Sequence, residues 1–314
     1  MTGDKDIAEV GRLSAVSLGA APLLAFSLFV FRPEISSAAP QTFNTALPVA
    51  QGEFVFREQF VLDQSGNDPA GTDRDRTAKS AISVLGYGAT KDLALFGVVP
   101  VSENRLELTE NGSRRARSAR GLGDVQVFAR YTAFKDDRKG QTFRVAPFGG
   151  IEMPTGEDDA RDSFGSLPKS VQLGSGSWDP FAGIVASFQT LDFQVDAQAS
   201  YKLNTEANDF EFGDVARLDA SLQYRLWPRK LGRGIPGFLY GTLEANLIHQ
   251  GKNENAGTED ENSNGTRLFL VPGLQYVTKR WIAEAAVQLP VYRNLNGTAL
   301  EKDYVVRTGF RVNF

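Results

Sequence analysis

The side chains that could carry out catalysis are few in kind. The chain of 314 residues contains no cysteine and a single histidine, His249. A cysteine nucleophile, a thiolate metal site and any site that needs two imidazoles are therefore excluded. A serine–histidine or carboxylate–histidine hydrolase would have to use His249, whose neighbours Gln250 and Gly251 offer no nucleophile. A hydrolase is a minor alternative, and we expect no catalytic residue, no cofactor and no metal.

Charged side chains recur instead at alternate positions of segments about ten residues long. In residues 192–203, Asp192 and Asp196 share one parity, whereas Phe193 and Val195 share the other. A β-strand places two such sets on its opposite faces. The pattern therefore indicates strands with one charged and one apolar face.

This alternation predicts an all-β chain of twelve strands. Connections after even-numbered strands are mostly short and those after odd-numbered strands mostly long, which is the layout of an outer-membrane barrel. Strands of this length also suit a tilted bilayer crossing. A soluble sandwich also alternates, but here the apolar parity mixes small, aliphatic and aromatic residues, which favours lipid contact. The expected spans are 53–62, 78–90, 93–101, 122–134, 141–153, 177–189, 192–203, 214–227, 237–250, 265–277, 281–292 and 303–314.

The first 38 residues differ from the rest. An uncharged apolar run over 13–31 follows Lys5 and Arg12, and small residues stand at Ser36 and Ala38. This is typical of a secretory signal peptide cleaved after Ala38; a single transmembrane anchor is the alternative. We expect a signal peptide over 1–38, a short periplasmic segment over 39–52, and a twelve-stranded antiparallel transmembrane β-barrel over 53–314 in the bacterial outer membrane. Whether residues 39–52 plug the periplasmic mouth stays open.

If the charged parity faces inward, the barrel has a charged lumen. Charges on the lipid face would be unfavourable, and of the strand charges only Glu58 takes the wrong parity. Basic and acidic residues are balanced, which predicts either a salt-bridge network that fills the lumen or a polar pore of low ion selectivity. The candidate lumen residues are Arg57, Asp124, Arg130, Arg144, Glu152, Asp179, Asp196, Arg217, Asp219, Arg225, Glu244, Arg267, Glu284, Arg307 and Arg311.

Three short motifs resemble one family. They are Gly121-Leu-Gly-Asp124, Pro154-Thr-Gly156 and Gly174-Ser-Gly-Ser-Trp-Asp179. In this order they resemble the MetA-pathway phenol-degradation family of outer-membrane transporters. The resemblance covers about residues 53–314 and implies a small barrel that passes hydrophobic or aromatic compounds. The motifs also have a structural interpretation, which we favour: the glycines permit tight backbone geometry, and Pro154 ends strand pairing.

The end of the chain and one long loop suggest partners. Phe310, Val312 and the terminal Phe314 resemble the signal that the barrel assembly machinery recognises. A basic cluster in the predicted loop 102–121, at Arg114, Arg115, Arg117 and Arg120, could bind lipopolysaccharide phosphates, although a solvated loop is the simpler interpretation. The net charge of −4 argues against nucleic-acid binding.

We therefore expect a monomeric outer-membrane barrel that passes small-molecule solutes passively. Twelve strands lie between filled eight-stranded barrels and wide porins of 16–18 strands, which predicts a narrow or gated path. The alternative is a structural or adhesive barrel with a closed lumen. The expected partners are outer-membrane lipid, lipopolysaccharide, the assembly machinery and the solute.

Overall fold

The computed structural model describes residues 37–230 and 234–314, which belong to one compact unit, Pro33–Phe314. The predicted signal peptide, apart from Ser37 and Ala38, lies outside the described residues. No helix in the described part of the chain has the length and apolar character needed to span a membrane.

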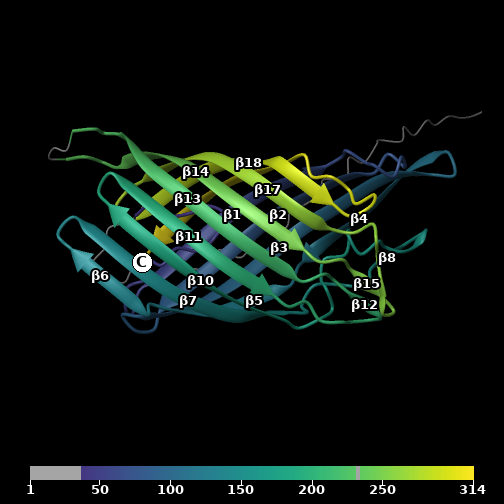
Figure 1. The fold of residues 1–314 in the computed structure, drawn as a ribbon, viewed down its shortest axis with the longest axis horizontal. Coiled ribbons are helices and arrows are strands. Elements are labelled where there is room, and N and C mark those ends of the chain that lie inside the picture. The colour runs from purple at the N-terminus through teal and green to yellow at the C-terminus, as the bar shows by residue number, and fades with distance from the viewer. Residues whose placement is uncertain (1–36, 231–233) are drawn as a thin grey trace, which may run out of the picture. The chain divides into compact units, whose positions relative to one another are not determined.

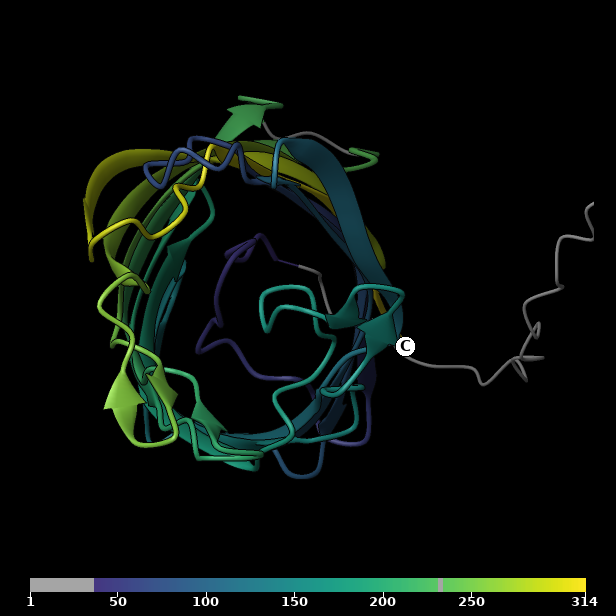
Figure 2. The ribbon, with the colours of Figure 1, turned by 90° about the vertical axis from the view of Figure 1, so that its right-hand side faces the viewer.

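Twelve antiparallel strands close into a barrel within the described residues (Figures 1 and 2). Each strand pairs with its neighbour in the chain, and β1 pairs with β19 to close the ring. Closure leaves no unpaired edge, which lipid would not tolerate. The barrel strands are β1 (Phe54–Ser65), β2 (Asp75–Gly88), β3 (Leu93–Glu110), β4 (Ser113–Leu122) continued by β5 (Val125–Tyr131) and β6 (Phe134–Arg138), β7 (Gln141–Met153), β10 (Asp179–Thr190), β11 (Phe193–Lys202), β13 (Val215–Trp227), β14 (Phe238–Gln250), β17 (Gly265–Val277), β18 (Trp281–Leu295) and β19 (Tyr304–Asn313).

The two parities of each strand face opposite ways, as predicted. On β11, Asp196 is fully buried whereas Val195 is 40% exposed. On β13, Asp219 is buried and Leu218 is 58% exposed. The exposed apolar side chains form the surface that contacts lipid.

Glu58 lies on the outward parity between Arg57 and Gln59, as the sequence predicted, and accepts a hydrogen bond from Ser83 Oγ at 2.6 Å.

One predicted loop is instead an extended hairpin. Residues 102–121 continue β3, turn at Asn111 and Gly112, and return as β4. Both turn residues have positive φ, as a two-residue hairpin turn requires. The prediction of a loop was wrong because the two strands continue beyond the membrane, where Leu106 and Arg117 on one face of the hairpin are buried against the β7–β10 connection.

Three of the remaining long connections carry two small sheets at the same end of the barrel. The β7–β10 connection holds β8 (Arg161–Asp162) and β9 (Gly165–Ser166). Its Val171 is fully buried in a cluster with Leu106 of β3, and Figure 2 shows this connection turning in over the barrel mouth. A second sheet joins β12 (Phe210–Glu211), β15 (Glu254–Asn255) and β16 (Thr258–Glu259).

Candidate functional site: the barrel lumen

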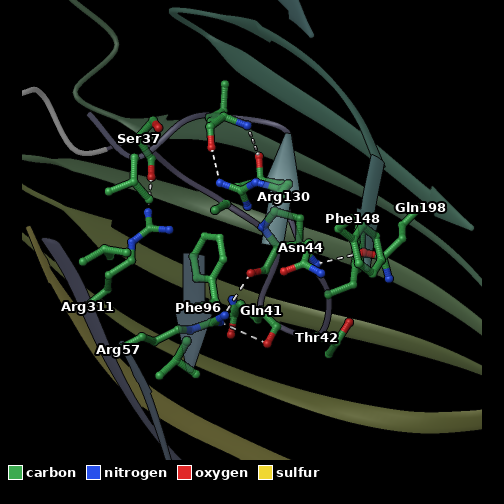
Figure 3. Close-up of a pocket in the computed structure, with 18 of the residues that line it drawn as sticks. Ser37, Gln41, Thr42, Asn44, Arg57, Phe96, Arg130, Phe148, Gln198 and Arg311 are labelled. Carbon is green, nitrogen blue, oxygen red and sulfur yellow. Dashed lines mark hydrogen bonds between the residues drawn. The ribbon is translucent and has the colours of Figure 1, made fainter. Parts of the chain in front are cut away.

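Residues 37–50, here called the N-terminal segment, run through the lumen (Figures 2 and 3). The chain enters beside Gly88, where a Cβ would lie 2.0 Å from the carbonyl oxygen of Ala50. Ala38, Gln41 and Ala46 are at most 2% exposed. The segment therefore fills part of the lumen near the short-turn end, which is periplasmic in outer-membrane barrels.

Backbone N–H groups of the N-terminal segment point to one arc of the wall. Gln41 N donates to Glu244 Oε1 at 2.6 Å, and Thr42 N donates to Glu244 Oε2 at 3.1 Å. Ala39 N donates to Gln275 Oε1 at 3.2 Å. Glu244 is 1% exposed, so these charge-assisted bonds are what compensates its buried charge.

Backbone carbonyls of the same segment accept from arginines. Arg57 Nη2 donates to Gln41 O at 3.0 Å, and Arg130 Nη2 donates to Leu47 O at 2.7 Å. Arg311 Nη2 donates to Ser37 O. Residues 37–50 carry no charged side chain, so the wall holds the segment mainly through its backbone.

The wall opposite this polar arc is aromatic. Phe96 of β3 stacks on Phe128 of β5, with ring centroids 4.7 Å apart. Phe128 also contacts Phe148 of β7 and Phe181 of β10, at centroid distances of 6.3 and 6.0 Å. Ala46 of the N-terminal segment packs against this cluster. We call the inward faces of β2, β3, β5, β7 and β10 the aromatic half-wall, and those of β11, β13, β14, β17, β18, β19 and β1 the polar half-wall.

A cavity of about 810 Å³ lies beside the N-terminal segment. Phe96, Phe128, Phe148 and Phe181 line it, together with wall arginines (Figure 3). A volume of this size is typical of small-molecule sites. The arrangement can therefore enclose an aromatic compound with polar contacts on one side.

The structure places most predicted lumen residues in ion pairs or buried networks. Asp196 is fully buried and accepts from Thr45 Oγ1 at 3.0 Å. Arg267 and Arg307 have no carboxylate within ion-pair distance among the described residues, and the Nε of each is buried without a hydrogen-bond partner there. The ion pairs that involve predicted lumen residues are Arg57–Glu284 (2.7 Å), Arg144–Asp137 (2.9 Å), Lys202–Glu152 (2.9 Å), Lys202–Asp179 (3.9 Å), Arg217–Asp219 (3.0 Å) and Arg225–Asp192.

The three sequence motifs meet within the composite strand, between β4 and β5. Asp124 accepts from Gly156 N at 2.9 Å and from Ser175 N at 2.6 Å. A Cβ on Gly174 would lie 2.5 Å from Gly156 O, so the two segments can approach only because this residue is glycine. The motifs thus anchor the β7–β10 connection to the barrel wall, because the Asp124 carboxylate accepts hydrogen bonds from the backbone of that connection.

The basic cluster is more ordered than a solvated loop. Arg117 is buried, pairs with Asp162 at 2.8 Å and donates to Gly165 O and Ser166 O. Its hydrogen bonds hold the pKa of the Asp162 carboxyl below its usual value. Arg120 of the same cluster is exposed. The cluster therefore divides into a tether for the β8–β9 hairpin and an outward-facing part.

His249 lies where the sequence predicted, exposed on the outward parity of β14. Its Nδ1 lies 2.8 Å from Thr266 Oγ1. Among the described residues, no group of three or more His, Cys, Asp or Glu side chains is placed to hold a metal ion.

The sequence analysis did not predict the aromatic half-wall or the position that the N-terminal segment takes in the lumen. The signal for the first was present, because Phe128 shares its parity with Asp124 and Arg130, and Phe148 shares its parity with Arg144. The second had no signal, because an uncharged segment without periodicity predicts no contact.

Comparisons with known proteins agree with this fold. The model of the family described as "Putative MetA-pathway of phenol degradation" matches residues 66–300. An outer membrane channel from Pseudomonas putida F1 is 14% identical with a TM-score of 0.65, covering 88% of this chain and 100% of its own. No curated protein matches significantly.

Two further solved structures are more distant, with TM-scores below 0.5. The β domain of the Bordetella autotransporter BrkA scores 0.44 at 13% identity, covering 84% of this chain and 100% of its own. The monoaromatic hydrocarbon channel CymD scores 0.41 at 7% identity, covering 84% and 89%. The predicted family, the twelve-stranded fold and the location in the bacterial outer membrane are confirmed.

Proposed function

The chain belongs to the MetA-pathway phenol-degradation family, and from that membership we propose that it is an outer-membrane channel for passive passage of small aromatic or hydrophobic compounds. The observation that carries the proposal is the cavity of about 810 Å³ between the N-terminal segment and a wall of phenylalanines. Aromatic rings favour offset-stacked or edge-to-face contacts of the kind these side chains already make with one another.

The N-terminal segment is the movable part in this proposal. It lies on the wall, and its contacts there are mostly single backbone hydrogen bonds. Hydrogen bonds to charged groups, such as these to Glu244, Arg57 and Arg130, contribute about 1.5–3 kcal/mol each. Displacement of the segment would widen the path past the aromatic half-wall.

Planar-bilayer conductance of the purified, refolded mature protein tests the proposal, with phenol or benzoate as added solute. We expect defined single-channel steps that the aromatic compound blocks. Steps that aromatics leave unchanged would contradict the aromatic selectivity. No steps from a verified folded barrel would favour the alternative of a structural or adhesive barrel, which the buried N-terminal segment supports.

Lumen charges are proposed to line the path. Changes of charge at Arg130, Arg144, Arg217 or Glu244 are expected to alter the conductance of the open channel. Unchanged conductance in all four variants would reject a path lined by these residues. Hydrolysis is not part of the proposal, because His249 faces outward, and His249→Ala should leave transport intact.

The last strand is proposed to guide assembly. Phe310 is 42% exposed on the lipid face, and the ring of Phe314 stacks on Phe54 with centroids 5.8 Å apart. We propose that Phe310, Val312 and Phe314 are recognised by the barrel assembly machinery and that the barrel acts as a monomer. Deletion of Phe314 should lower the amount of folded barrel in the outer membrane. Sedimentation of the purified protein checks the monomer.

A polar row above the apolar band is proposed to meet lipopolysaccharide. Neighbouring positions on the outward faces of β2, β3 and β4 hold Ala81, Val101 and Leu122. Two residues further from the membrane on the same faces are Lys79, Glu103 and Arg120. Lys79 and Arg120 are exposed there. Lys79→Gln with Arg120→Gln should reduce co-purified lipid A phosphate relative to Arg138→Gln, an exposed arginine at the other end of the barrel. Equal lipid content would contradict the contact.

A further inference from the structure

The cavity wall is strongly basic. Glu53 is the one acidic side chain that lines it among the described residues, against six arginines and Lys202. Four of the cations have a carboxylate partner in the wall behind them, at Glu284, Asp137, Asp219 and Glu152. The balance of charge expected for the lumen therefore does not hold inside the cavity.

Three of the lining arginines have no carboxylate partner among the described residues. Arg130 donates to Leu47 O, and Arg311 donates to Ser37 O. The Nε of Arg307 is buried with no hydrogen-bond partner there. A buried guanidinium that faces a neutral carbonyl, or no acceptor, is undercompensated relative to an ion pair. An anion in the cavity would supply negative charge that these guanidiniums lack.

Arg130 stands beside the phenylalanines. Its guanidinium lies over the Phe96 ring, 4.8 Å from the centroid. It follows Phe128 by two residues on the same face of β5 and pairs in register with Phe148 of β7. Figure 3 shows Arg130, Phe96 and Phe148 around the N-terminal segment. An anionic group held by Arg130 would therefore place an attached ring against the aromatic half-wall.

We propose that the cavity binds aromatic carboxylates, with the carboxylate on Arg130, further positive charge from Arg307 and Arg311, and the ring among Phe96, Phe128 and Phe148. This rests on the proposed channel function and names its substrate class. The carboxylate takes the position of the Leu47 carbonyl. Arg130 then faces a negative charge in place of the neutral Leu47 carbonyl, and the added Coulomb attraction displaces this part of the N-terminal segment from Arg130.

Calorimetric titration of the folded mature protein in detergent tests the ligand class with three probes. Benzoate should bind at least about tenfold more tightly than benzyl alcohol, which keeps the ring without the charge, as loss of a hydrogen bond to a charged group implies. Benzoate should also bind more tightly than acetate. Equal affinity for benzyl alcohol would overturn the anion site, and equal affinity for acetate would overturn the aromatic part.

Two arginine variants test whether the carboxylate binds at Arg130 and near Arg307. Arg130→Gln should weaken benzoate binding by about tenfold or more. Arg307→Gln removes a group with no hydrogen-bond partner among the described residues, so it should fold normally and still weaken benzoate severalfold. The control is Arg144→Gln, which lowers the charge of the same cavity by the same amount at a residue paired with Asp137. Equal losses in all three variants would show unspecific attraction and overturn the assignment.

Vesicle uptake separates this inference from the channel function. If phenol enters vesicles that contain the protein and benzoate neither binds nor enters, the channel stands and the aromatic-carboxylate site is rejected. If benzoate binds in the predicted order and no aromatic compound enters, the site stands and the channel function is rejected.

Discussion

The two halves of the lumen wall follow different chemistry although they belong to one continuous sheet. The polar half-wall presents Asp196, Asp219, Glu244 and Glu284, all at most 8% exposed. The aromatic half-wall presents four phenylalanines whose rings contact one another. The N-terminal segment bridges the two, with hydrogen bonds to Glu244 and Gln275 on one side and Ala46 packed near Phe148 on the other.

This difference shows how a closed barrel can hold both a displaceable segment and a binding space. On the polar half-wall the segment is held by hydrogen bonds, including those to Glu244 and Gln275. On the aromatic half-wall it accepts a hydrogen bond from Arg130 and also packs Ala46 against the phenylalanines. Loss of a polar contact should therefore release the segment, and loss of a ring should change what the cavity accepts.

The largest effect is expected from removing the segment itself. Deletion of residues 40–50 should raise the single-channel conductance severalfold, because the lumen loses its internal filling while all barrel strands remain. Heat-modifiable migration on gels checks that the barrel folds. Unchanged conductance of a folded deletion variant would show that the constriction lies elsewhere.

Glu244→Gln should open the channel by weakening the polar contacts alone. Hydrogen bonds to a charged group are worth about 1.5–3 kcal/mol, so the loss of charge should raise the occupancy of the higher-conductance state by about tenfold or more. Glu152→Gln is the matched control, because Glu152 bonds to Lys202 and Gln126 and not to the N-terminal segment. Similar opening in both variants would argue against specific release.

Phe128→Ala should change selectivity and leave the segment in place. An aromatic pair contributes about 0.5–1.5 kcal/mol beyond burial, so the concentration of phenol or benzoate needed for half-block should rise by about twofold to tenfold. Phe60→Ala is the control, since Phe60 is 54% exposed on the outer surface. If both variants behave alike, the aromatic half-wall does not contact the solute.

The smallest effect concerns pH at the loop over the aromatic half-wall. Arg117 lowers the pKa of Asp162, so their tether is fully present above the ordinary aspartate pKa of about 3.9 and is lost as pH falls through the lowered value. Pepsin should cut the β8–β9 hairpin faster only below about pH 4. Arg117→Gln should abolish this pH step, and a step of the same size in the variant would assign it to another group.

The sequence alone determined the strand count, the facing of the charged residues and the closed antiparallel barrel. These follow from a period of two and from loop lengths, both of which are local properties of the chain. The outward orientation of Glu58 and His249 also followed from the period of two. The β3–β4 hairpin did not, because alternation alone does not distinguish a loop from strands that extend beyond the membrane.

Tertiary structure decided what the lumen contains. The sequence of residues 37–50 does not predict that their backbone forms hydrogen bonds with Glu244, Arg57 and Arg130. Those partners lie between 16 and 203 residues away along the chain. Parity also cannot say which inward residues meet. The pairing of Arg57 with Glu284, and the absence of such a partner for Arg130 among the described residues, depend on which strands closure brings together around the ring.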